Sequence, residues 1–291
     1  MHSHTAHIDG FHYGWINPVL SYLVAFTGAA LGLRCTVRAL SLPPRRRLGW
    51  LLLAAVEFGC GIWTMHFLAM MGFAVTGSAI VYSVPKTLAS LALAIVVVGA
   101  GILYVGYRPR GWTTLLIGGT ATGCGVAAMH YLGMAAMQVQ GQVSYDTVIV
   151  IASIGIAVFA ATAALWMTLN VTGFVASMIA SLIAGVAVTA MHYTGMAAVS
   201  VRLDAATHGD GLPASEFIIP LAVAIMVVIS VGGFVLTLSP NDTLTQAGVF
   251  APAKARTTAG ATAGATAATT AARAASRTGT HTGPRTGPAE R

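Results

Sequence analysis

Seven long apolar stretches constrain this chain more than any other feature of its sequence. The residues are 56% hydrophobic and only 8% charged, whereas an average soluble domain is about 25% charged. A helix needs about 20 predominantly apolar residues to cross a bilayer, and each stretch is close to that length. The stretches are residues 16–33, 48–73, 88–105, 113–137, 148–169, 175–199 and 217–238. We therefore predict an all-α polytopic membrane protein with seven transmembrane helices. The lipid bilayer is then one of its partners.

The basic residues predict how these helices are oriented. Lys and Arg collect in the cytoplasmic loops of membrane proteins. Thirteen of the 15 basic residues follow the first or third predicted helix or lie in the C-terminal segment, and only Lys86 and Arg202 lie on the other side. We expect the N-terminus outside the cell and the C-terminus in the cytoplasm.

The sequence outside the predicted helices differs from them in composition. Residues 1–15 form a histidine-rich outer leader, which is either disordered or a weak metal binder. Residues 16–240 form the membrane domain. Residues 241–291 are rich in Ala, Thr, Gly, Pro and Arg without apolar periodicity, which predicts a disordered basic tail. Most of the net charge of +7 lies in this tail, so the charge indicates proximity to anionic lipid and gives no reason to expect a nucleic-acid partner.

A gap-free repeat occurs three times in the second, fourth and sixth predicted helices. The copies begin at Gly59, Gly123 and Gly185 and share the pattern G-x-small-[IV]-x-x-M-H-[FY]-x-[AG]-M. Their histidines are 64 and 62 residues apart, which is one pair of helices per period. An even number of crossings per repeat makes the copies parallel, with their symmetry axis along the membrane normal.

The repeat also predicts where its histidines lie. His66, His130 and His192 each come about 18 residues after the cytoplasmic start of their helix, or about 27 Å at 1.5 Å per residue. Small residues upstream of each histidine allow membrane helices to approach closely. If the three helices pack around a pseudo-threefold axis, the histidines converge in the outer leaflet.

The combination of histidine and methionine indicates a metal-binding site in preference to other kinds of binding site. Each histidine shares a helical face with the methionine four residues later. Imidazole binds copper, zinc or iron, while thioether is a soft ligand that favours Cu(I). The structural alternative is that the histidines bond across helix interfaces and the methionines fill the core. We predict a copper site formed by Met65, His66, Met70, Met129, His130, Met134, Met191, His192 and Met196.

The repeats resemble a known family. Residues 129–132 and 191–194 read M-H-Y-L and M-H-Y-T, and residues 65–68 read M-H-F-L, which is similar to the MHYT domain of bacterial membrane proteins. The resemblance covers about residues 12–240. It implies that the Met and His of each copy are proposed copper ligands, whereas Met70, Met134 and Met196 are added here on helical geometry alone. Phe67 replaces the motif tyrosine in the first copy, which questions any role that needs three hydroxyl groups.

The resemblance also implies a function. The family is described as a sensor module of the bacterial inner membrane, proposed to sense oxygen, carbon monoxide or nitric oxide through copper. Its better-known members carry attached signalling enzymes, whereas only a short low-complexity segment follows the last predicted helix. We therefore expect a stand-alone, non-enzymatic form that signals to a separate cytoplasmic partner.

Other residues leave alternatives open. Glu57 lies within the second predicted helix, where a carboxylate must be paired, protonated or hydrated, and it could belong to a proton or ion path. The first alternative function is copper transport or metal handling, in which the His/Met ring passes copper inward with Glu57 on the path. Haem is the less favoured cofactor, since histidines from facing helices can hold its iron. A copper-dependent oxidase is a further alternative, although no nucleophile-base set or phosphate-binding loop occurs. Cys60 and Cys124 are expected to be core residues turned away from the histidine face, with metal ligation by these thiols as the alternative.

Overall fold

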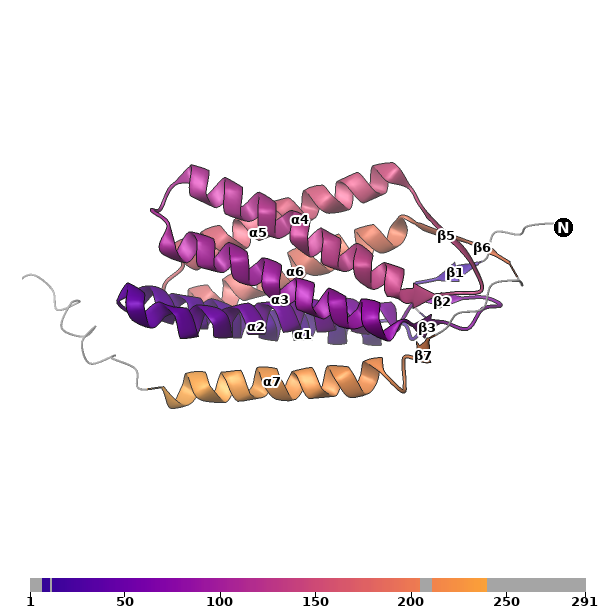
Figure 1. Ribbon diagram of the computed structural model, residues 1–291, viewed down its shortest axis with the longest axis horizontal. Coiled ribbons are helices and arrows are strands. Elements are labelled where there is room, and N and C mark those ends of the chain that lie inside the picture. Colours follow the sequence, from indigo (N-terminus) through magenta and orange to yellow (C-terminus); the bar gives the residue numbers. More distant parts are fainter. Residues whose placement is uncertain (1–6, 11, 205–210, 240–291) are drawn as a thin grey trace, which may run out of the picture. The chain divides into compact units, whose positions relative to one another are not determined.

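Seven helices form the fold. The computed structural model describes residues 7–10, 12–204 and 211–239. The helices are α1 (Ile16–Ser41), α2 (Pro44–Met70), α3 (Val84–Tyr107), α4 (Trp112–Ala136), α5 (Thr147–Asn170), α6 (Phe174–Ala197) and α7 (Ile218–Leu238). Each is long and apolar enough to cross a membrane (Figure 1). The predicted all-α membrane fold is confirmed, while the predicted tail and His2 and His4 lie outside the described residues.

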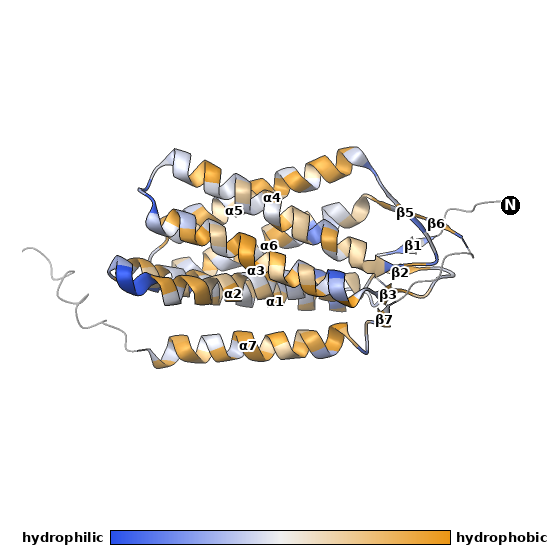
Figure 2. Ribbon diagram, in the orientation of Figure 1, coloured by the Kyte–Doolittle hydropathy of each residue, from blue (hydrophilic) through white to orange (hydrophobic). Residues whose placement is uncertain are grey.

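Helices α1 and α2 extend beyond their apolar stretches at the ends that face each other along the chain. α1 continues to Ser41 and α2 begins at Pro44, beyond the predicted limits at residues 33 and 48. The added turns carry several arginines, whose long side chains can place their charge in water while the helix continues. Figure 2 shows this hydrophilic end at the start of α2, opposite the strands. A count of apolar residues finds the part inside the hydrocarbon and misses these turns.

The first six helices form a closed ring. Each of them contacts the next along the chain, and α6 contacts α1. Helices α2, α4 and α6 carry the repeated motif, and α2 also contacts α4 and α6 across the interior. Helix α7 packs against α2 and α1. The three repeats are therefore arranged around a pseudo-threefold axis, as the repeat period predicts.

The first glycine of each repeat brings neighbouring helices together. A Cβ atom on Gly59 would lie 2.7 Å from the Ile95 backbone of α3. A Cβ atom on Gly123 would meet the Val158 backbone of α5, and one on Gly185 would lie 3.1 Å from the Tyr22 ring of α1. The motif helices thus need a minimal side chain at this position to pack against the next helix.

Short antiparallel strands connect the loops at one end of the ring. They are β1 (Ile8–Asp9), β2 (Ala74–Val75), β3 (Val81–Tyr82), β4 (Met137–Gln138), β5 (Gly141–Tyr145), β6 (Val199–Leu203) and β7 (Leu212–Pro213). β3 pairs with β4 and β7, β5 pairs with β6, and β1 pairs with β2. The pairings join the loops that follow α2, α4 and α6, so these helices all end on the same side (Figure 1).

This strand layer closes the end of the ring with apolar side chains. Val75, Tyr82, Met137 and Val201 are all less than 7% exposed. Burial raises the pKa of the Tyr82 hydroxyl above its ordinary value, so this residue stays neutral at physiological pH. We call the seven strands and their loops the cap.

Candidate metal centre

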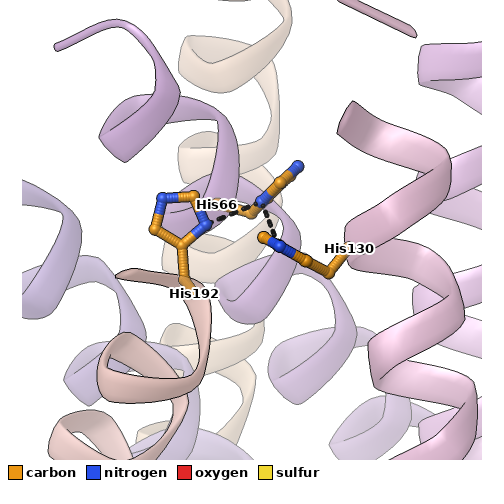
Figure 3. Close-up of side chains that lie close together, drawn as sticks. All are labelled: His66, His130 and His192. Atoms are coloured by element: carbon orange, nitrogen blue, oxygen red, sulfur yellow. Dashed lines mark hydrogen bonds between the residues drawn. The ribbon is translucent and has the colours of Figure 1, made fainter. Parts of the chain in front are cut away.

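Three histidines meet inside the ring, next to the cap. His66, His130 and His192 come from α2, α4 and α6, and each is at most 1% exposed. The Nδ1 atom of His66 lies 3.0 Å from Nδ1 of His192 and 3.1 Å from Nδ1 of His130. Figure 3 shows the three rings pointing toward one another. The predicted convergence of the histidines is therefore present, and we call this cluster the triad.

Hydrogen bonds among the three histidines do not satisfy all of their ring nitrogens. An Nδ1 atom has one in-plane direction, along which it either donates a proton or offers a lone pair. The Nδ1 atom of His66 faces two neighbours at once, so it cannot make two well-aligned hydrogen bonds. Three ring nitrogens that lie within 4.8 Å of one another suit a single cation better. Three nitrogens bound to one metal ion at about 2.0–2.1 Å lie about 3.3–3.6 Å apart, which is slightly longer than the two Nδ1 separations that involve His66.

The surroundings of the triad limit which group fits it. In the described part of the chain, no carboxylate or thiol joins the three histidines in a potential metal site. The ring centroids are 4.8–5.2 Å apart, which leaves no room for a haem between them. Neutral imidazoles without a counter-charge favour an ion of low charge, because burying charge is costly in a membrane. The donor set therefore fits one small metal ion and not a haem.

Packing holds the imidazole rings in place. The Nε2 atoms of all three histidines are buried without a hydrogen-bond partner among the described residues. A Cβ atom on Gly133 of α4 would collide with Nε2 of His66, and one on Gly195 of α6 would collide with Nε2 of His130. Both glycines occupy the small position three residues after the repeat histidine, where the first copy has Ala69. We call Gly133 and Gly195 seats, because each receives a ring from the preceding repeat.

The aromatic position of the repeat ties neighbouring helices together. The Tyr131 hydroxyl lies 2.6 Å from Oγ of Ser153, the seventh residue of α5. The first copy has Phe67 instead of a tyrosine, but the indole N–H of Trp63 donates to Ser90 at 2.9 Å, and Ser90 is the seventh residue of α3. An indole nitrogen one turn earlier thus replaces the missing hydroxyl. Trp63 and Tyr131 are both visible in the sequence. Their equivalent roles become clear only from the contacts with Ser90 and Ser153 on the neighbouring helices.

The six additional candidate ligands are methionines of the same helices. Met196 is half-buried. The other five are at most 1% exposed, and they are Met65, Met70, Met129, Met134 and Met191. Met191 lines a cavity next to the triad. The burial agrees with ligation and also with core packing. The ligand role of these thioethers stays a prediction.

Glu57 lies away from the triad, against α7. Its side chain is fully buried, and neither carboxylate oxygen has a hydrogen-bond partner among the described residues. A Cβ atom on Gly232 of α7 would collide with Oε1 of Glu57. Glu57 therefore packs between α2 and α7, nine residues before His66. The role of Glu57 in a proton or ion path remains a prediction.

The cysteines and the outer histidines do not join the triad. Cys35 and Cys60 are buried, whereas Cys124 is exposed on α4, so the expectation that Cys124 is a core residue is wrong. A repeat position with small residues can face either a neighbouring helix or lipid, and sequence alone does not distinguish these cases. His7 and His12 are exposed near the cap, and Nδ1 of His12 lies 3.8 Å from the Asp9 carboxylate.

The fold and the triad define a class: a polytopic membrane protein of three helix-pair repeats around a buried histidine cluster. Comparison with known sequences gives the family. The chain belongs to the MHYT family, described as a bacterial signalling protein N-terminal repeat, which matches residues 59–118, 123–181 and 185–249. Each matched segment begins at or next to the glycine that opens a repeat.

Several longer signalling proteins are similar to this chain. The bifunctional diguanylate cyclase/cyclic di-GMP phosphodiesterase MucR of Pseudomonas aeruginosa is 32% identical over 253 residues, covering 84% of this chain and 36% of that protein. The cyclic di-GMP phosphodiesterase NbdA of the same organism is 35% identical, covering 65% and 24%. The signalling protein YkoW of Bacillus subtilis is 26% identical, covering 68% and 25%. The chain thus spans about a third or less of the length of these relatives, and no solved structure matches it.

Proposed function

We propose that this chain is a membrane sensor module in which His66, His130 and His192 bind one copper ion through their Nδ1 atoms. The observation that carries the proposal is the convergence of three buried Nδ1 atoms, two pairs of which lie 3.0–3.1 Å apart. Membership in a family of signalling proteins supports the sensory role. When bound, copper supplies an open coordination position for oxygen, carbon monoxide or nitric oxide, which are the proposed stimuli.

The proposed orientation places the cap outside the bacterial inner membrane. The arginine-rich ends of the helices then lie in the cytoplasm, as the distribution of Lys and Arg favours. The triad lies within about two turns of the cap end of each motif helix. A stimulus from outside would reach it after crossing only the cap or the outer leaflet.

The proposed output leaves through α2 and α7. Helix α2 carries both His66 and Glu57, which lies nine residues earlier. Glu57 contacts α7 at Gly232. A change at the triad that moves α2 would therefore act on α7, the last described helix. A cytoplasmic signalling partner is the proposed receiver.

The alternatives receive less support. Copper transport through the ring would use Glu57 on the path, yet Glu57 packs against α7 and does not line the central cavity. Haem does not fit between rings 4.8–5.2 Å apart. An enzymatic function is not supported by the names of the relatives. Those names belong to longer proteins, of which this chain matches only the N-terminal region.

Metal analysis of the purified full chain tests the proposal. The wild type, loaded with copper and washed, is compared with a His66/His130/His192→Ala variant. The matched control is a His7/His12→Ala variant, which removes two exposed histidines outside the ring. We expect one copper per chain in the wild type and the control and none in the triad variant. Equal copper in all three proteins would refute the proposal.

A further inference from the structure

A central cavity lies directly under the triad. It has a volume of about 80 Å³ and is lined by residues from all of helices α1 to α6. Ile62, Val126 and Val188 form part of its wall, and each lies one helical turn before a triad histidine. A turn rises 5.4 Å, so the cavity begins about that distance below the histidines. We call this cavity the chamber.

Small residues of α5 create the chamber. Ala157, Ala161, Ala164 and Thr168 all line it, and their spacing of four, three and four residues places them on one face of the helix. Ala25 and Ala29 of α1 add further small side chains to the wall. The ring leaves space here because these positions contribute few atoms toward the axis.

The chamber offers almost no polar contact. Its walls are apolar except for Thr122 and Thr168. The Thr168 hydroxyl donates to the Ala164 carbonyl of its own helix at 2.8 Å. The Thr122 hydroxyl is the other polar group of the wall, and it has no hydrogen-bond partner among the described residues. A buried water needs two to four polar partners, and cavities lined by apolar side chains stay dry. Water and ions are therefore poor occupants.

We propose that the chamber binds one small non-polar molecule of about two or three heavy atoms, taken up from the bilayer. A dry apolar cavity of about 150 Å³ accommodates benzene or xenon, so a chamber of about half that volume suits a smaller molecule or a single xenon atom. A haem is too large for it. Binding here does not require copper, whereas its link to sensing rests on the proposed function, because it places the molecule one turn from the triad.

Xenon is the probe for this proposal. Metal-free, detergent-solubilised full chain is equilibrated with xenon, and bound xenon is measured by ¹²⁹Xe saturation-transfer NMR. The test variants are Ala161→Leu and Ala164→Leu, which place side-chain atoms in the chamber. The matched control is Ala152→Leu, an exposed alanine of the same helix. We expect saturable xenon binding in the wild type and the control, and at least a tenfold weaker signal in both test variants.

The remaining outcomes are also decisive. Absence of saturable binding in the wild type, or equal binding in all four proteins, would overturn the proposal. If a leucine variant fails to fold, as judged by its circular dichroism, Ala161→Val replaces it and is expected to weaken xenon binding by a smaller factor. Xenon binding in the His66/His130/His192→Ala variant, together with absence of copper binding in the wild type, would refute the proposed function and leave the chamber assignment standing.

Discussion

The imidazole of His66 rests against the backbone of Gly133, a residue of the next repeat. A Cβ atom at Gly133 would collide with Nε2 of His66, and Gly195 has the same relationship to His130. The small residue of the second and third motifs thus contacts a histidine of the preceding motif. The positions of the His66 and His130 rings therefore depend on the backbone of the next repeat.

Substitution of a seat residue should therefore displace a ring of the triad. We expect Gly133→Ala to destabilise the chain by about 1–3 kcal/mol, the usual cost of overpacking, and to lower copper affinity at least tenfold. Thermal unfolding and copper competition titration measure the two effects. The control is Gly155→Ala on α5, where a Cβ atom meets nothing within 4 Å. Wild-type copper affinity in Gly133→Ala would contradict the seat assignment.

The hydrogen bonds from the motif helices to the two serines should contribute to stability. Tyr131→Phe removes the contact with Ser153, and Trp63→Phe removes the contact with Ser90. We expect Tyr131→Phe to cost about 0.5–1.5 kcal/mol, the net value of a typical hydrogen bond, and Trp63→Phe to cost more because it also loses buried area. Thermal unfolding is compared with Tyr13→Phe, an exposed position. An unchanged melting temperature in Tyr131→Phe would show that the hydroxyl contributes nothing.

The contact between Glu57 and α7 predicts a difference between two adjacent glycines. A Cβ atom on Gly232 would collide with Glu57, whereas one on Gly233 would be at ordinary contact distance, 3.4 Å from Leu31. Both substitutions to alanine gain the same helix propensity, about 1 kcal/mol. We expect Gly232→Ala to lower the melting temperature and Gly233→Ala to leave it unchanged or raise it. Equal shifts would mean that α7 does not pack against Glu57 as described.

The orientation of the helices can be tested with single added cysteines. Ala79 is exposed in the cap, and Arg110 is exposed at the opposite end of the ring. With the cap outside, a membrane-impermeant thiol reagent should label Ala79→Cys in intact cells and label Arg110→Cys only after lysis. The parent chain corrects for the native cysteines. Labelling of Arg110→Cys in intact cells would reverse the proposed topology.

The sequence predicted the repeated parts of this structure and missed the parts that depend on single contacts. Apolar length and a gap-free motif predict seven helices and a convergent triad, because each residue of a period repeats the same signal. A two-residue strand such as β3 is too short to show an alternating pattern of apolar residues. The sequence therefore does not predict the cap. The seat at Gly133 was visible as a small residue, but its partner His66 is 67 residues away. The chamber likewise depends on the absence of side chains from α5, which only the assembled ring reveals.

In the proposed metal centre, three histidine nitrogens bind one copper ion together. X-ray absorption at the copper edge of the loaded, washed full chain tests it most directly, because it reports the atoms bound to the metal. We predict about three nitrogen neighbours at about 2 Å, the usual length of a metal–imidazole bond, with any sulfur contribution coming from the motif methionines. A spectrum with sulfur or oxygen neighbours and fewer than two nitrogens would rule out a copper site formed by the three histidines.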